Sequence, residues 1–181
     1  LTEEAYYHAR EGGVLLFDLG VKFDTYISSP EARAIQTALA VMEGQTVLRS
    51  GKQTLLDDLN YCFGSVRCGI AYTDAELAAL KNEAAQRELS VEACLLVTAQ
   101  AELAKKRHHR AIVATCELSK LVGSYNGQTI LVTSHSGSTI EPLVAEVSGF
   151  EVSQIPVMKP GGMVGLRFYN GRFHSVVCDV L

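Results

Sequence analysis

The order of apolar and polar residues predicts alternating helices and short strands. A short apolar run at Ile130–Thr133 predicts a buried strand, and apolar residues of helical period follow it. Alternating apolar and polar residues predict another strand at residues 23–28. Helical spacing predicts helices at residues 2–16, 30–43 and 74–89, then one long helix or two helices within 91–121, joined near residues 105–110.

Local residue signals predict where several of these helices begin and end. Thr73 and Glu76 stand at the spacing of a capping box, which predicts a helix start between them. Ser29 is expected to cap the helix that Pro30 opens, because proline is tolerated at the first helical position. Gly44 is expected to end that helix.

The C-terminal part of the chain predicts a β-hairpin. Asn170-Gly171 separates two strand-like runs, at residues 163–169 and 172–177, and this dipeptide is typical of a type I′ turn. A short strand is expected near residues 46–48, and residues 50–72 read as a loop that forms a lid or wall. The order of elements indicates a single α/β domain over residues 1–181.

Composition and charge narrow the function classes. The chain has 181 residues, of which 48% are hydrophobic and 20% charged, as in globular domains. A net charge of −4 argues against nucleic acid and membrane surfaces as partners. The basic run at residues 105–110 stands out, and its ordinary interpretation is a solvated helix face. No apolar run reaches the roughly 18 residues that a membrane span needs.

The five cysteines argue against a disulfide framework or a zinc site. Their number is odd and no C-x-x-C pair occurs, so we expect no metal and no cofactor. Reduced thiols fit a cytoplasmic protein best.

Two strand–turn–helix units hold the residues best suited to chemistry. His135 lies in the small-residue turn after the strand at Ile130–Thr133, and Arg33 lies one turn into the helix after Ser28-Ser29-Pro30. If the two strands are parallel, both turns meet at one sheet edge, where helix starts favour anions. Arginine offers a planar fork of donors for a phosphoryl group, and histidine can donate a hydrogen bond or a proton. Together they suggest phosphate binding.

The stretch from Ser28 to Ala38 resembles the S-S-P-x-x-R-A-x-Q-T-A signature of the histidine phosphatase superfamily, the phosphoglycerate mutase-like group. Leu1-Thr2-Glu3 resembles the start of that family's helix L-T-E-x-G-x-x-Q-A, and Ile130 to Gly137 resembles its late strand ending in H-G or H-x-G. The C-terminal hairpin fits as well. The resemblance covers essentially the whole chain.

The resemblance implies a three-layer fold in which helices flank a mostly parallel central sheet, with the antiparallel hairpin at its C-terminus. It also implies that Arg33 binds the phosphoryl group, and that His135 is the second active-site histidine, assisted by the backbone N–H of Ser136. The implied partner is a small phosphorylated molecule or phosphate, and a homodimer is compatible with this reading. A phosphomonoester hydrolase that acts through a phosphohistidine is the expected function.

One departure from the family concerns the nucleophile, a histidine in an R-H-G motif at the end of the family's first strand. No R-H-G occurs in the 181 residues. His8 stands at a helical position with no strand before it and is not favoured for the role. We expect the motif upstream of Leu1, because a sheet without an interior strand would leave buried backbone groups unpaired.

Another departure concerns the general acid, which many members place as the Glu of E-x-x-x-G. Here the glycine is Gly64, and Asn60 stands at the position of the acid. Asp58, or Asp57, is the candidate replacement, and ordinary solvated loop carboxylates are the alternative.

Three other interpretations stay open. Ser134 to Ser138 resembles a degenerate nucleophile elbow, in which Ser136 would attack, with His174 and Asp179 as partners in an unusual order. A catalytically inactive member that only binds a phosphate ligand or a protein is a further reading. A phosphoglycerate mutase is the third, although no dedicated carboxylate-binding set is evident.

Overall fold

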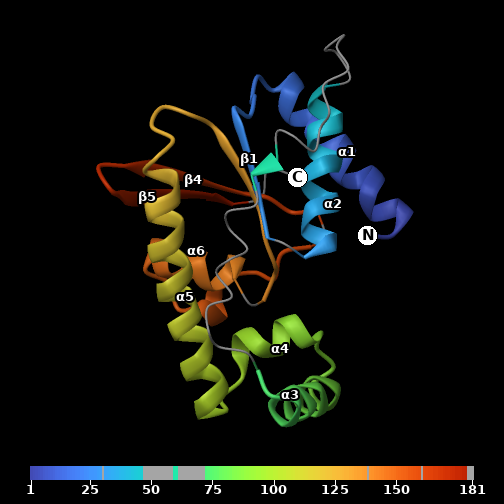
Figure 1. The fold of residues 1–181 in the computed structure, drawn as a ribbon. Helices are drawn as coiled ribbons and strands as arrows, with labels where there is room; N and C mark the ends of the chain where they lie inside the picture. Colours follow the sequence, from blue (N-terminus) through green and yellow to red (C-terminus); the bar gives the residue numbers. More distant parts are fainter. Residues whose placement is uncertain (30, 47–58, 61–71, 138, 160, 179–181) are drawn as a thin grey trace.

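The structure is a computed structural model that describes residues 1–29, 31–46, 59–60, 72–137, 139–159 and 161–178. Figure 1 shows the arrangement of its elements. In chain order they are α1 (Glu3–Asp18), β1 (Thr25–Ser28), α2 (Ala32–Thr46), β2 (Leu59–Asn60), α3 (Asp74–Gln86), α4 (Val91–Val97), α5 (Ala101–Val122), β3 (Ile130–Thr133), α6 (Ile140–Ser148), the 3-10 turn η2 (Val152–Gln154), β4 (Val164–Tyr169) and β5 (Arg172–Cys178).

A small parallel sheet carries the two predicted strand–turn–helix units. Its order is β2-β1-β3, and β1 pairs in parallel with both neighbours. The register of β1 and β3 runs from Thr25 opposite Ile130 to Ser28 opposite Thr133. The strands therefore end level with each other, and the turns that follow them lie at the same edge.

The two faces of this sheet pack against different helices. On one face, Leu131 clusters with Ala9 of α1 and with Val41 of α2. On the other face, Ile27 clusters with Leu118 of α5 and with Leu143 of α6. Because successive side chains of a strand point to opposite faces, β1 and β3 contribute to both clusters.

Helices α1 and α2 lie side by side (Figure 1) and approach closely at glycines. A Cβ atom added to Gly13 would meet the carbonyl oxygen of Val41 at 2.3 Å, and one added to Gly44 would meet that of Arg10 at 2.1 Å. Gly44 lies inside α2, because the helix continues to Thr46. The prediction that Gly44 ends the helix is wrong. Close helix packing, rather than termination, accounts for this glycine.

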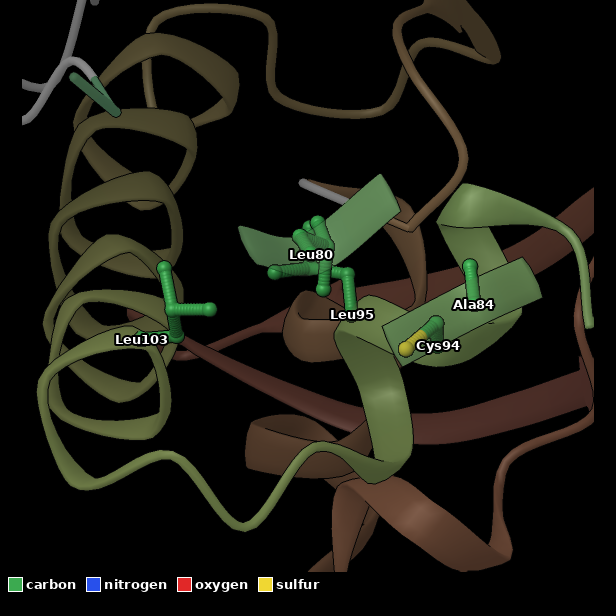
Figure 2. Packing of buried hydrophobic residues seen from close by; sticks show 5 residues of the cluster. All are labelled: Leu80, Ala84, Cys94, Leu95 and Leu103. Carbon is green, nitrogen blue, oxygen red and sulfur yellow. The ribbon is translucent and has the colours of Figure 1, made fainter. Parts of the chain in front are cut away.

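A second packed unit is made of α3, α4 and the N-terminal part of α5. Figure 2 shows the side chains at its centre, which are Leu80, Ala84, Cys94, Leu95 and Leu103. Lys106 forms an ion pair with Glu76 at 2.6 Å, and Arg107 donates to the carbonyl oxygens of Leu95 and Leu96, near the end of α4. Lys106 and Arg107, two residues of the basic run, thus hold α3, α4 and α5 together. Burial of the Arg107 guanidinium lowers its pKa.

The antiparallel pair β4–β5 forms as predicted. Asn170 and Gly171 both have positive φ, 50° and 76°, which the type I′ turn requires. Within the described residues the pair is a sheet of its own, separate from β2-β1-β3. The predicted α/β class is confirmed, whereas the three-layer arrangement around a mostly parallel central sheet stays a prediction.

Several predicted boundaries need correction. The residues predicted as one long helix or two form α4 and α5, which separate at Thr98–Gln100, before the basic run rather than near it. Strand β2 lies within the predicted loop 50–72, of which residues 50–58 and 61–71 lie outside the described part of the chain. Thr46 ends α2 rather than starting a strand, and residues 47–48 also lie outside.

Two cysteine side chains among the described residues are free thiols. Cys94 is a buried free thiol and Cys116 an exposed one. Among the helices in the described ranges, none combines the length and the apolar character of a membrane span.

Substituting Gly13 by alanine is expected to destabilise the fold by about 1–3 kcal/mol, because the new methyl group meets main-chain atoms that cannot move alone. Gly123→Ala is the control, since its Cβ would lie 3.2 Å from the nearest atom, the Ser119 carbonyl oxygen. Urea unfolding measures both. Equal unfolding midpoints for the two variants would contradict the close packing of α1 on α2.

Acid is expected to weaken the unit of α3, α4 and α5. The hydrogen bond from Lys106 lowers the pKa of Glu76 below its ordinary value of 4.5, and the bond from Thr98 lowers that of Glu83. A carboxyl group with a depressed folded pKa stabilises the protein above its unfolded pKa, and this contribution is lost as the pH falls through the folded pKa.

The double variant Glu76→Gln/Glu83→Gln should therefore lose less stability than the wild type between about pH 7 and about pH 3. Urea midpoints at both pH values measure the difference. Glu102→Gln, at an exposed position of α5, is the control and should follow the wild type. A double variant as acid-sensitive as the wild type would contradict the assignment.

Candidate functional site

The candidate site lies where β1 and β3 end. The backbone N–H of Ser29 donates to the carbonyl of Thr133 at 3.0 Å, which extends the pairing by one bond beyond β1. The hydroxyl of Thr133 donates to the carbonyl of Ala34 at 3.1 Å. The start of α2 is thereby fixed to the end of β3.

Ser29 and His135 meet at this edge. The Oγ atom of Ser29 lies 2.8 Å from Nε2 of His135, although 106 positions separate the two residues. Ser29 is 7% exposed and His135 is half-buried. The contact fixes the orientation of the imidazole at a point that the two strand ends define.

The predicted role of Ser29 as a helix cap needs revision. Helix α2 begins at Ala32, and the Ser29 hydroxyl accepts from the N–H of Glu31 only at 3.4 Å. Its shorter contact is the one with His135. The strand that brings His135 to this hydroxyl comes from far along the chain, so local capping rules do not foresee the pairing.

The turn after His135 uses most of its own backbone donors. The carbonyl of His135 accepts from the N–H groups of Thr139 and Ile140, at 3.2 and 3.1 Å. Gly137 has φ 73°, and its N–H donates to Glu141. The N–H of Ser136 has no acceptor among the described residues, and it is therefore the backbone donor that this turn offers to a ligand.

Glu141 is the residue of this region that the sequence did not single out. Its side chain is fully buried and accepts from the Ser136 hydroxyl at 2.5 Å, the Gly137 N–H at 2.6 Å and the Met158 N–H at 2.9 Å. An acid in the first turn of a helix usually reads as favourable to the helix dipole. The sequence held no signal that this one would be buried.

Helix α4 closes one side of the turn. A Cβ on Gly137 would lie 2.9 Å from Cβ of Glu92, so only glycine fits here, and the positive φ demands it as well. Glu92, in the first turn of α4, is an exposed carboxylate beside the candidate site.

Arg33 stands at the second residue of α2 and is exposed. Among the residues that the structure describes, its guanidinium has no hydrogen-bond or ion-pair partner. Its neighbour Ala34 is buried, and the carbonyl of Ala34 is anchored to Thr133. Arg33 thus projects from a helix start that is fixed to the strand ahead of His135, and its donors are available to an anion.

The nucleophile-elbow interpretation finds no support in the hydrogen bonds. The Ser136 hydroxyl donates to the buried carboxylate of Glu141 rather than to a histidine. His174 lies exposed in β5, where its Nε2 donates to the carbonyl of Tyr169. Asp179 lies outside the described residues. In a nucleophile elbow a histidine is the base within hydrogen-bond reach of the serine, whereas the Ser136 hydroxyl here contacts a carboxylate.

Other candidate residues lie elsewhere or outside the described ranges. His8 lies on the exposed side of α1, 3.8 Å from both Glu4 and Glu11. Asp57 and Asp58 fall outside the described part of the chain, so their predicted role stays a prediction. In the described ranges no three His, Cys, Asp or Glu side chains gather as a metal site would require.

The fold and the site define an α/β protein with a histidine and an arginine after neighbouring parallel strands. The family model of the histidine phosphatase superfamily (branch 1) matches residues 1–179. The chain therefore belongs to the histidine phosphatase superfamily. This membership supports a phosphatase- or mutase-like function.

A solved structure agrees on the fold. Bacillus stearothermophilus YhfR is similar with a TM-score of 0.62 and 20% sequence identity, over 100% of this chain and 85% of that chain. At this identity the likeness concerns the fold alone. No curated protein sequence matches the chain.

Replacing Ser29 by alanine is expected to change the hydrogen bonding of the His135 imidazole, because it removes the hydroxyl that lies 2.8 Å from Nε2. The ¹⁵N signals of the His135 ring should shift, most at Nε2, which loses its contact with the Ser29 hydroxyl. Ser148→Ala, whose hydroxyl donates within α6, is the control. Unchanged His135 signals in Ser29→Ala would contradict the pairing.

Proposed function

We propose that the protein binds the phosphoryl group of a small phosphorylated molecule at the ends of β1 and β3, and that it acts as a phosphomonoester hydrolase of the histidine phosphatase type. The observation that carries this proposal is the contact of Ser29 with His135 at the strand ends. Arg33 stands at the start of the helix that follows β1. The full fold in this proposal is a three-layer one, with β1 and β3 in a mostly parallel central sheet.

The roles follow from the chemistry of each group. Arg33 supplies a planar fork of N–H donors and a positive charge for two phosphoryl oxygens. His135 donates one hydrogen bond to a further oxygen, and the Ser136 N–H supplies another. The groups are built on strand ends and a helix start, which limits the reorganisation needed on binding.

Hydrolysis through a phosphohistidine proceeds in two steps. An imidazole nitrogen attacks phosphorus while the bond to the leaving alcohol breaks, and an acid delivers a proton to the leaving oxygen. Water then breaks the phosphorus–nitrogen bond, which yields phosphate and the free imidazole. We assign the acid to Asp58.

The attacking imidazole in this family belongs to its R-H-G motif, and the 181-residue sequence contains no such motif. The residues of this chain therefore account for the binding half of the site. The second candidate is a member that binds a phosphorylated ligand without turning it over. Binding alone requires only Arg33, His135 and Ser136.

Two further expectations belong to the proposal. Neither nucleic acid nor a membrane is a partner, given the net charge of −4. A cytoplasmic location and a homodimer stay predictions, as does the mutase activity.

Arg33→Ala and His135→Ala are each expected to weaken phosphate binding. Loss of one charge-assisted contact costs about 1.5–3 kcal/mol, which is roughly a 10- to 150-fold rise in Kd. NMR titration of the 181-residue chain with inorganic phosphate measures this, with Arg172→Ala as an exposed-arginine control. Wild-type protein that does not bind phosphate, or an Arg33→Ala variant that binds it equally well, would contradict the proposal.

Turnover of p-nitrophenyl phosphate separates the two candidates. Measured on the full-length gene product, a hydrolase loses turnover in His135→Ala, whereas a binding protein shows phosphate affinity and no turnover in the wild type. If a fluorophosphonate labels Ser136, both candidates fail and the serine hydrolase reading returns.

A further inference from the structure

Glu141 is the one Asp or Glu among the described residues whose side chain is buried; its exposure is 0%. Burying a carboxylate costs free energy unless hydrogen-bond donors compensate its charge, so a buried glutamate needs donors around it. Neither the family resemblance nor the proposed chemistry gives this residue a role.

Three donors compensate the charge: two belong to the turn after His135 and one to the segment at Met158. Oε1 accepts from the Ser136 hydroxyl and from the Met158 N–H, while Oε2 accepts from the Gly137 N–H. Hydrogen bonds to an ionised acceptor are the strong ones, about twice as strong as neutral pairs. One side chain thereby joins the His135 turn, helix α6 and the segment after η2.

The contacts differ from ordinary helix capping. The N-cap residue of α6, Thr139, makes no side-chain capping bond. Glu141 reaches back past it to Ser136 and Gly137, which precede the helix. The carboxylate therefore sets the conformation of the turn itself, in which Gly137 has a positive φ.

The contacts of Glu141 determine which hydrogen-bond donors of the turn remain available to a ligand. With the Gly137 N–H and the Ser136 hydroxyl bound to Glu141, the Ser136 N–H remains without an acceptor among the described residues. The carbonyl of His135 is held by Thr139 and Ile140, so the backbone on both sides of the turn is fixed.

We propose that Glu141 is the positioning residue of the phosphate site: its buried carboxylate holds the Ser136–Gly137 turn, and through it the imidazole of His135 and the N–H of Ser136. This inference rests on the proposed phosphate-binding function. Glu141 itself does not touch the ligand.

Glu141→Gln tests the inference, because it keeps the size of the side chain and replaces one acceptor oxygen by an NH₂ donor. Phosphate Kd should rise about tenfold, equivalent to about 1.4 kcal/mol. The Gly137 amide proton and the ring signals of His135 should shift in the ligand-free protein, because the charge-assisted bond is lost.

Leu143→Ala is the matched control, since this buried leucine lies in the same helix and packs in the cluster with Ile27 and Leu118. It should lower the unfolding midpoint, yet leave phosphate Kd and the His135 signals close to wild type. Ser136→Ala removes one of the three donors and should give a smaller rise in Kd than Glu141→Gln. It serves as the second variant if Glu141→Gln does not fold.

The outcomes separate the two proposals. The positioning role is overturned if Glu141→Gln keeps the wild-type phosphate Kd and unshifted His135 signals. It is also overturned if Leu143→Ala changes the Kd and the His135 signals as much as Glu141→Gln does. If wild-type protein shows no saturable phosphate binding, the proposed function fails. In that case the ring signals of His135 in the ligand-free protein test the positioning by Glu141. They must shift in Glu141→Gln and remain unshifted in Leu143→Ala.

Discussion

The parallel pairing of β1 with β3 is the interaction on which the rest of the site depends. It aligns Ser28 with Thr133, so that the next residues of both strands emerge together at one edge. The N–H of Ser29 continues the ladder, and the Ser29 hydroxyl reaches His135. A shift of one residue in this register would turn every side chain to the other face and separate the pair.

The helices around this sheet have different tasks. α1 and α2 pack at glycines that allow close approach, which fixes the helix that carries Arg33. α4 packs beside the His135 turn, and Lys106 and Arg107 of α5 tie α3 and α4 in place. Two members of a basic run that was expected to be a solvated helix face thus stabilise the helices beside the site instead.

The hydrogen bonds of Glu141 explain how a buried carboxylate can lie beside the proposed anion site. The buried carboxylate of Glu141 is stabilised by three hydrogen bonds, from the Ser136 hydroxyl and from the N–H groups of Gly137 and Met158. A phosphoryl group would instead meet the side chains of Arg33 and His135 and the N–H of Ser136. The start of α6 therefore contributes fewer free donors than a bare helix N-terminus would.

The sequence by itself determined the features that depend on interactions between residues close together in the chain. Capping at Thr73, the Asn170-Gly171 turn and the apolar strand at Ile130–Thr133 depend on near neighbours, and all three are confirmed. The signature around Arg33 and the turn at His135 were likewise evident, because motifs record the chemistry that a site needs.

Only the tertiary structure decided which distant residues meet. Gly44 lies inside a helix because α1 approaches it, and Ser29 faces His135 instead of capping its own helix. Glu141 is buried because the turn and the segment at Met158 close over it. These contacts join positions that are far apart along the chain or depend on how separate elements pack, and neither periodicity nor propensity encodes such distances.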